Sequence, residues 1–296
     1  MISIALATYN GKKYLKEQLD SIINQTMKPD EIVIRDDLST DGTFEFILEY
    51  SEKNKNIKWN IKQNEINLGY KKNFYNSIIS CSGDYIFLSD QDDIWIENKI
   101  EIMMNEMKKN DILLLMSNLQ SFYQEDCKNI VKQEWLGIKR LKKKFNINHC
   151  VNTPRPGCTF CITKELVQLY KKNIDFLLPH DNLLWHIASL NKRVYNLNKT
   201  TMKYRRHSSN ASNNKKNNKN KRIDAIKEQI KNIEYLIELS NEKKFFISQK
   251  KVFEKRLNNL ENNKVINVFF SIIYFKYYYS WRIWLVDIYY VLKGVK

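Results

Sequence analysis

Short apolar runs alternate with helical stripes of apolar residues over the first third of the chain. Residues 2–7, 31–35 and 85–88 are apolar runs with the length of buried strands. Between the first two runs, residues 15–23 carry apolar side chains at i, i+4, i+7 and i+8, the spacing of one helix face. Strands and helices that alternate with short loops predict an α/β fold, with a mostly parallel central sheet covered by helices on both faces.

The pattern becomes less regular from about residue 112. A helix is expected to begin near Asp181, and residues 194–197 and 200–204 are predicted to be the strands that close the sheet. An Asn/Lys-rich tract then precedes apolar residues at helical spacing from Ile223 to Ile237. We therefore expect a domain at residues 1–210, with halves at 1–110 and 111–210, a basic linker at 211–222 and a C-terminal helical extension at 223–296.

Composition places the chain among globular proteins, and its charge is uneven. Apolar residues make up 43% of the 296 residues and aromatic residues 12%, which suits a buried core, while only 7 Gly and 4 Pro exclude a collagenous or linker-like chain. The formal charge is +16, and residues 203–296 contribute +13 of it, with 21 basic against 8 acidic side chains. A basic terminal third is typical of chains that contact phosphate, in nucleic acid or on a membrane surface. Composition does not choose between the two.

The five cysteines and the first segment bear on the compartment. An odd number of cysteines, together with a first segment that enters a strand pattern without a basic and then apolar leader, predicts a cytoplasmic protein. Cys158 and Cys161 form a CxxC pair, but no second pair follows. We interpret both as ordinary small residues rather than as zinc ligands.

Three carboxylates occur in four residues in the segment Asp90-Gln91-Asp92-Asp93, directly after the predicted strand at 85–88. Like charges this close repel one another unless a cation lies among them. Mg2+ and Mn2+ prefer oxygen ligands of this kind and often share them with a diphosphate. The alternative is a solvated acidic turn that caps a helix beginning near Ile96, and the segment alone does not decide.

Polar clusters at residues 8–11 and 36–43 also follow predicted strands. Ligands of open α/β sheets bind outside the carboxyl ends of the strands, so we expect these clusters to meet the acidic segment. Tyr9 offers a flat ring on which a nucleobase could stack, with a core tyrosine as the alternative, and Gly11 suits a tight turn.

In the second cluster, Asp36 or Asp37 suits the imide N–H of uracil or thymine, and we interpret the next three polar residues as helix caps. The chain has no GxGxxG or P-loop pattern, which counts against a dinucleotide dehydrogenase or a P-loop NTPase.

Four motifs occur in order: ATYNG at residues 7–11, DDLSTDGT at 36–43, NLG at 67–69 and SDQDD at 89–93. Together they resemble the family 2 glycosyltransferases of the GT-A fold, and bacterial rhamnosyltransferase-like members in particular. The resemblance covers roughly residues 1–210. It implies a GT-A nucleotide-sugar-binding fold and an inverting transfer of a sugar from a dTDP- or UDP-sugar donor. The implied acceptor is a glycan or lipid-linked acceptor in bacterial surface polysaccharide synthesis.

The resemblance also implies a role for each matching position. Donor binding is assigned to Thr8, Tyr9, Asn10, Asp37, Asp90 and Arg206. Asp92, Asp90 and His207 are the implied ligands of Mg2+ or Mn2+, with a basic surface strand as the alternative for the late Arg/His pair. The implied catalytic base is Asp181, which otherwise reads as a helix cap. Residues on the acceptor side are Asp93, Arg155, Gly157 and His180.

Residues 265–292 mix Phe, Tyr and Trp with charged residues that interrupt the roughly 20 apolar residues needed to span a bilayer. Such a segment is typical of the bilayer interface, and the alternative is a helix packed on the catalytic domain or on a partner subunit. We expect a membrane surface at the inner face of the cell membrane as a partner, no nucleic acid, and leave homo-oligomerisation open. A nucleotidyltransferase-type metal enzyme and a nucleic-acid-binding protein that uses the basic third are the alternatives from other classes.

Overall fold

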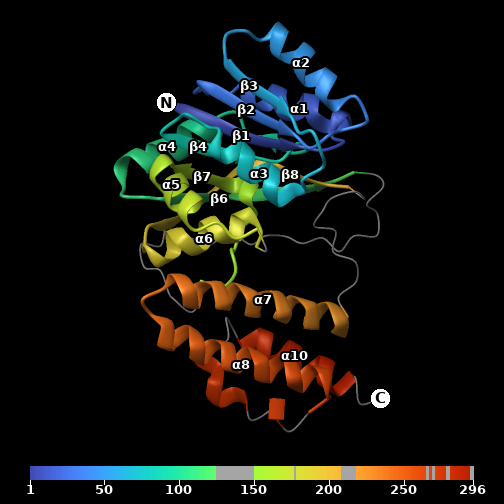
Figure 1. The fold of residues 1–296 in the computed structure, drawn as a ribbon, viewed down its shortest axis with the longest axis vertical. Coiled ribbons are helices and arrows are strands. Elements are labelled where there is room, and N and C mark those ends of the chain that lie inside the picture. Colours follow the sequence, from blue (N-terminus) through green and yellow to red (C-terminus); the bar gives the residue numbers. More distant parts are fainter. Residues whose placement is uncertain are drawn as a thin grey trace. The chain divides into compact units, whose positions relative to one another are not determined.

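The computed structural model describes residues 1–124, 150–176, 178–207, 218–264, 267–268, 271–277 and 281–293. The chain divides into two compact units (Figure 1). The first unit contains residues 1–144 and 154–213, and the second contains residues 145–153 and 214–296. Residues 211–217 of the expected linker lie outside the described residues.

The first unit alternates strands and helices along its first half, as the apolar pattern predicts. Its strands are β1 (Ile2–Thr8), β2 (Glu31–Asp36), β3 (Lys58–Gln63), β4 (Tyr85–Ser89), β5 (Ile94–Trp95), β6 (Leu114–Tyr123), β7 (Phe160–Thr163) and β8 (Val194–Arg206). Its helices are α1 (Lys12–Ile23), α2 (Thr43–Lys53), α3 (Tyr70–Ile79), α4 (Lys99–Lys109), α5 (Lys164–Lys172) and α6 (His180–Leu190), with a 3-10 turn, η3 (Gly157–Thr159).

The strands form one eight-stranded sheet with the order β3-β2-β1-β4-β7-β6-β8-β5. Parallel ladders join β3 to β2, β2 to β1, β1 to β4, and β6 to β8, while β7 and β5 pair antiparallel with their neighbours. The predicted α/β fold with a mostly parallel sheet is confirmed. The chain leaves β1 towards β2 on one side and returns to β4 on the other. The carboxyl ends of β1 and β4 therefore flank the switch point at which open α/β sheets bind ligands.

Helices cover the sheet on both faces. The main hydrophobic core joins Ile4 and Leu6 of β1 to Leu15 of α1, Ile47 of α2 and Met103 of α4. None of its members comes from α3, α5 or α6, which contact one another instead. Because side chains alternate between the faces of a strand, the second group of helices covers the opposite face.

Two predicted boundaries differ from the structure. The helix expected near Ile96 begins at Lys99, because Ile94 and Trp95 first pair with Lys203 and Met202 of β8. The two predicted closing strands are one continuous strand, β8, with register shifts in its ladder with β6. Both differences come from pairing between segments about 100 residues apart, which local sequence patterns do not record.

The described helices of the second unit are α7 (Lys219–Leu239), α8 (Lys243–Glu261), the 3-10 segment η4 (Ser271–Tyr277) and α10 (Trp281–Lys293). Helix α7 begins inside the expected linker, where the Asn218 side chain accepts a hydrogen bond from the Lys221 N–H. A buried ion pair holds the helices together, since the Asp287 carboxylate contacts Arg222 and Arg256 at 2.8 Å. In the part of the chain that the structure describes, every helix is too short or too polar to cross a membrane.

Candidate active site

The polar clusters after β1, β2 and β4 lie together at one edge of the sheet. The parallel ladders bring Thr8 level with Asp36, and Leu6 level with Ser89. Side chains then connect the loops: the Asn10 N–H donates to Ser39 Oγ and the Tyr9 N–H donates to Gln91 Oε1, both at 2.8 Å. Three segments that are far apart in sequence therefore form one continuous surface.

Thr8 and Asn10 hold this surface together. Thr8 is buried, and its hydroxyl donates to Asp36 Oδ1 at 2.8 Å. Its side chain therefore positions the loop, and the donor contact expected of Thr8 stays a prediction. Asn10 has a left-handed φ of 47°, which Asn tolerates, and its Oδ1 accepts from the Thr40 N–H at 2.8 Å. Both predicted donor-binding residues join the ends of β1 and β2.

Asp41 acts as the helix-capping residue that the sequence predicts. Its Oδ1 accepts from the Thr43 N–H at 3.0 Å, at the start of α2, and its Oδ2 accepts from the Lys12 N–H at 3.2 Å, at the start of α1. One carboxylate thus satisfies donors at two helix N-termini, which fixes the β1 and β2 loops relative to each other.

Asp37 accepts hydrogen bonds from the loop between β3 and α3. Its Oδ1 accepts from the Leu68 N–H and its Oδ2 from the Gly69 N–H, each at 2.8 Å. The Asn64 amide donates to Oδ1 at 2.8 Å as well. The NLG motif therefore wraps the Asp37 carboxylate, which is 2% exposed.

Tyr9 follows Thr8, whose carbonyl oxygen accepts from the Asp37 N–H at 2.9 Å, and the Tyr9 side chain is 50% exposed. The alternative of a core tyrosine is therefore wrong. An exposed aromatic ring at the carboxyl end of β1 presents a face on which a planar ligand can stack.

The acidic loop after β4 meets the end of β8. Asp92 Oδ2 lies 2.8 Å from His207 Nε2, so two of the three expected metal ligands are in contact. The loop does not cap a helix, because α4 begins at Lys99 after the residues of β5. The alternative of an acidic helix cap is therefore wrong.

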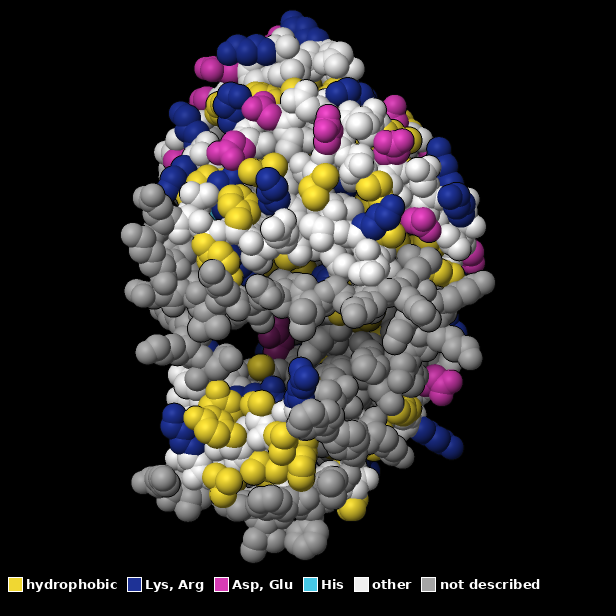
Figure 2. All heavy atoms as spheres, turned by 180° about the vertical axis from the view of Figure 1, so that it is seen from behind, with side chains coloured by type: hydrophobic (Ala, Val, Ile, Leu, Met, Phe, Trp, Pro, Cys, Tyr) yellow, Lys and Arg dark blue, Asp and Glu magenta, His cyan; other side chains and the backbone are white. Residues whose placement is uncertain are grey.

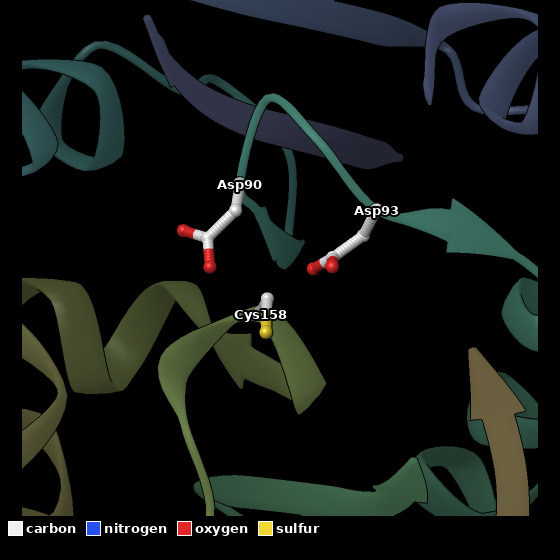
Figure 3. A group of neighbouring side chains, drawn as sticks. All are labelled: Asp90, Asp93 and Cys158. Carbon is white, nitrogen blue, oxygen red and sulfur yellow. The ribbon is translucent and has the colours of Figure 1, made fainter. Parts of the chain in front are cut away.

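Beneath this pair lies a cluster of Asp90, Asp93 and Cys158, whose ligand atoms lie within 4.8 Å of one another (Figure 3). Burial, and then the charge of Asp92, raises the pKa of Asp90 to about 7. The same causes raise the pKa of Asp93 well above its ordinary value. Asp93 is fully buried and accepts from the Arg205 N–H at 3.0 Å. Asp93 therefore links the acidic loop to β8, and its expected place on the acceptor side stays a prediction.

Lys99 is a fully buried lysine under this cluster that the sequence interpretation missed. Its ammonium donates to the Cys158 carbonyl oxygen at 2.8 Å and lies 4.1 Å from the centre of the Trp95 ring. Burial lowers the pKa of Lys99 to about 8, and the charges of Asp93 and Asp90 act in the opposite direction. The lysine therefore offsets part of the negative charge of the acidic loop from inside the protein.

Arg205, which the sequence interpretation did not single out, contacts the acidic loop, while the donor contact expected of Arg206 stays a prediction. The Arg205 guanidinium donates to the Asp92 carbonyl oxygen at 2.7 Å and pairs with Glu17 at 2.9 Å. Arg206 instead lies over the Tyr204 ring at 4.6 Å. Alternate residues of a strand share a face, so Arg205 belongs with His207, and Arg206 with Tyr204. The period of two in β8 is the signal that would have chosen Arg205.

Asp181 lies in the first turn of α6, whose N-cap is Pro179. Its carboxylate accepts from the neighbouring Asn182 N–H at 2.8 Å, so it is not the N-cap of this helix. Burial raises the pKa of Asp181 to about 6, and its charge in turn contributes to the raised pKa of Asp90. The base expected on the acceptor side therefore lies within electrostatic reach of the acidic loop.

Gly157 and His180 pack around Asp181. A Cβ on Gly157 would lie 2.8 Å from His180 Nε2 and 3.4 Å from Asp181 Cβ, so no larger residue fits between them. His180 stacks on Phe74 with ring centroids 4.0 Å apart, and burial lowers its pKa to about 3, which keeps the ring neutral. These two predicted acceptor-side residues meet the predicted base.

Arg155, which is also expected on the acceptor side, forms hydrogen bonds with β6 and with its own loop. It is 4% exposed, and its guanidinium donates to Asn118 Oδ1 at 2.9 Å and to the Pro154 carbonyl oxygen at 3.0 Å. The side chain supports β6 and the loop before η3, and its expected place on the acceptor side stays a prediction.

Comparisons with known proteins agree with this arrangement. The family model described as "Glycosyl transferase family 2" matches residues 3–169. The chain is 32% identical over 238 residues to the dTDP-rhamnosyl transferase RfbG of Shigella flexneri, covering 76% of this chain and 80% of that protein. It is 25% identical over 235 residues to the UDP-Glc:alpha-D-GlcNAc-diphosphoundecaprenol beta-1,3-glucosyltransferase WfgD of Escherichia coli, covering 78% of this chain and 87% of the relative.

A solved structure gives the same fold. The mannosyltransferase PcManGT of Pyrobaculum calidifontis, in complex with GDP-Man and Mn2+, superposes with a TM-score of 0.61. The match covers 98% of this chain and 84% of that protein at 13% sequence identity, so it bears on the fold alone. The sheet and helices described above are those of the GT-A fold.

Proposed function

Because this chain belongs to glycosyl transferase family 2 and is a glycosyltransferase, we propose that it moves a sugar, with inversion, from a dTDP- or UDP-sugar to a glycan or lipid-linked acceptor of a bacterial surface polysaccharide. One observation carries this proposal: the acidic loop bonds to Tyr9 on one side and interacts with the Asp181 carboxylate on the other. The acidic loop thus connects the residues proposed for base stacking, cation binding and proton transfer. Family membership favours glycosyl transfer over nucleotidyl transfer and nucleic-acid binding.

The donor's nucleotide part is assigned to Tyr9 and Asp37. The exposed Tyr9 ring would stack on the base, a contact worth about 1–3 kcal/mol. Asp37 would accept the imide N–H of uracil or thymine through a remaining carboxylate lone pair, since each oxygen has two. The names of the two relatives, a dTDP-rhamnosyl transferase and a UDP-Glc glucosyltransferase, support both bases.

Nucleotide binding tests this assignment through thermal stability. We expect UDP- and dTDP-sugars to raise the melting temperature of the full chain, since a ligand at 100 times its Kd adds about 2.7 kcal/mol of stability. ADP-glucose should shift it less, because adenine has no imide N–H for Asp37 and offers an unprotonated ring nitrogen instead. Equal shifts with all three nucleotides, or none with any, would rule out the assigned base site.

The acidic loop fits a divalent cation. Asp90 and Asp92 supply carboxylate oxygens and His207 an imidazole nitrogen, a donor set that suits Mg2+ or Mn2+. Burial, and then the charge of Asp92, raises the pKa of Asp90 to about 7, and a cation relieves the repulsion between the two carboxylates. When bound, such an ion stabilises the charge that develops on the departing nucleoside diphosphate. Asp92 and His207 hold each other in place at 2.8 Å.

Asp181 is assigned the proton transfer. With a pKa of about 6 it is ionised at neutral pH, yet basic enough to accept a proton as the acceptor hydroxyl attacks. The hydroxyl oxygen forms a bond to the anomeric carbon, the bond from that carbon to the diphosphate oxygen breaks, and the hydroxyl proton passes to an Asp181 oxygen. The neutral His180 ring and Gly157 fix the position of this carboxylate.

The second unit is proposed to bind the cytoplasmic face of the cell membrane, near a lipid-linked acceptor. One stripe of α10 carries Leu285, Val286, Tyr289 and Leu292, each at least 40% exposed. Figure 2 shows hydrophobic side chains gathered over the C-terminal helices beside Lys and Arg side chains. An apolar stripe on a basic helical unit is the combination that binds anionic lipid surfaces.

Vesicle flotation tests this membrane contact. The full chain should bind anionic vesicles and lose affinity as salt is raised, and the double variant Leu285→Ser, Leu292→Ser should bind more than about tenfold more weakly. Leu48→Ser is the matched control, since Leu48 is an exposed leucine on α2 of the first unit. If the double variant floats as well as the wild type, α10 does not bind the lipid; loss of a dimer in the variant would assign the stripe to a second copy.

A further inference from the structure

Gln91, the one uncharged residue in the acidic loop, forms two hydrogen bonds with the backbone of Tyr9. Its Oε1 accepts from the Tyr9 N–H at 2.8 Å, and its Nε2 donates to the Tyr9 carbonyl oxygen at 3.0 Å. The carboxamide therefore pairs with Tyr9 as a neighbouring strand would, using both of its polar atoms. Its two sequence neighbours, Asp90 and Asp92, are the proposed cation ligands.

Gly11 leaves the space in which the Gln91 side chain lies. A Cβ on Gly11 would lie 2.2 Å from Gln91 Oε1 and 2.4 Å from its Cδ. The backbone of Gly11, with φ −109° and ψ 3°, lies in a region that other residues adopt, so the tight turn expected there does not require glycine. The absence of a side chain at residue 11 is explained by the approach of Gln91.

Further hydrogen bonds connect the loop that holds Tyr9 to the loop after β2, which holds the proposed nucleobase-binding residue Asp37. The residue after Tyr9, Asn10, exchanges two hydrogen bonds with Ser39 and Thr40, both at 2.8 Å. Ser39 in turn donates to Asp36 Oδ1 at 2.6 Å, beside the Asp37 carboxylate. Gln91 therefore connects the acidic loop, which holds the proposed cation ligands, to the loops after β1 and β2, which hold the proposed nucleobase-binding residues.

We propose that Gln91 is a positioning residue that couples cation binding to nucleobase binding, a claim that rests on the proposed function. When a cation is bound by Asp90 and Asp92, the conformation of the acidic loop is fixed. The two hydrogen bonds of Gln91 then fix the Tyr9 backbone, and with it the position of the Tyr9 ring on which the base stacks. The coupling acts in both directions, because a base that favours the cation-bound loop must raise cation affinity by the same factor.

The test uses a ligand that cannot touch the cation. Uridine and thymidine lack phosphate, so any effect of Mg2+ on their binding must pass through the protein. In the wild-type full chain, we expect Mg2+ to raise nucleoside affinity about fivefold or more, measured as a Kd by NMR titration. In Gln91→Met, which keeps the side-chain length without the hydrogen bonds, nucleoside affinity should be the same with and without Mg2+.

Gly11→Ala provides an independent way to break the contact while the acidic loop keeps its sequence. The new methyl group would displace the flexible end of Gln91, so this variant should also lose the effect of Mg2+ on nucleoside binding. In the Gln91→Met background, Gly11→Ala should change the nucleoside Kd by less than about twofold, because the hydrogen bonds to Tyr9 that it would break are already absent. This non-additivity would not arise if Gly11→Ala simply loosened the fold.

The outcomes separate this inference from the proposed function. A wild type that binds nucleoside and Mg2+ independently of each other overturns the role of Gln91 and leaves the proposed function intact. A fivefold effect that persists in Gln91→Met or in Gly11→Ala also overturns it. A wild type that binds neither ligand contradicts the proposed function, and the role of Gln91 fails with it.

Discussion

Asp181→Asn is expected to lower the rate of sugar transfer by about 100-fold to 10,000-fold, the usual contribution of a general base. The amide has the shape of the carboxylate but cannot accept the proton of the acceptor hydroxyl. The half-buried Asp181 side chain lies beside Gly157 and accepts a hydrogen bond from the Asn182 N–H, so the substitution leaves its surroundings in place. Transfer is measured as the release of nucleoside diphosphate with the acceptor at saturation.

The raised pKa of Asp181 predicts the direction in which activity changes with pH. Burial raises the pKa of Asp181 from 3.8 to about 6, so the base form is present above pH 6 and is lost below it. At saturating Mn2+, where Asp90 is kept ionised, kcat/KM of the wild type should fall about tenfold for each pH unit below 6. The Asp181→Asn variant should lack this acid limb.

Stability provides the control for Asp181→Asn. A carboxyl whose pKa is raised on folding costs stability above its unfolded pKa, so the variant should melt at the same or a higher temperature at pH 8. Glu49→Gln, at an exposed carboxylate on α2, should keep full activity. A variant at residue 181 that melts normally and transfers sugar at the wild-type rate would exclude Asp181 as the base.

The sequence predicts the strands next to the switch point because each is a continuous apolar run between helical stripes. It also predicts which loops meet, since polar residues directly after β1, β2 and β4 must share the carboxyl edge of a parallel sheet. Tyr9, Asp92 and His207 could be singled out on this basis together with the family resemblance.

The sequence did not reveal features that depend on distant pairing. Lys99 resembles a surface lysine at a helix start, and only its contact with the Cys158 carbonyl oxygen, 59 residues away, shows it to be buried. Gly11 resembles a turn glycine, whereas its neighbour is Gln91, 80 residues later. Thr8, Asp93 and Arg155 are buried and form hydrogen bonds within the protein, which their residue types alone do not reveal, because a polar residue near a site can also be satisfied from within. The ligand contacts expected of them stay predictions.

Asp92→Ala is expected to be nearly inactive, with kcat/KM lowered by about 1000-fold, the scale seen when charge stabilisation in a transition state is removed. The substitution removes one carboxylate from the proposed cation site and leaves His207 without its partner at 2.8 Å. It also removes a negative charge that helps to raise the pKa of Asp90, so that pKa should fall towards its ordinary value.

The central claim is that the edge formed by the β1, β2 and β4 loops performs cation-dependent glycosyl transfer. The most direct test is the rate of nucleoside diphosphate release from UDP- and dTDP-sugars, with and without Mn2+, by the wild type, Asp92→Ala and the control Asp111→Ala, whose carboxylate is 77% exposed. The account predicts Mn2+-dependent release by the wild type and the control, and about 1000-fold slower release by Asp92→Ala. Full activity of Asp92→Ala, or release that is independent of Mn2+, would contradict it.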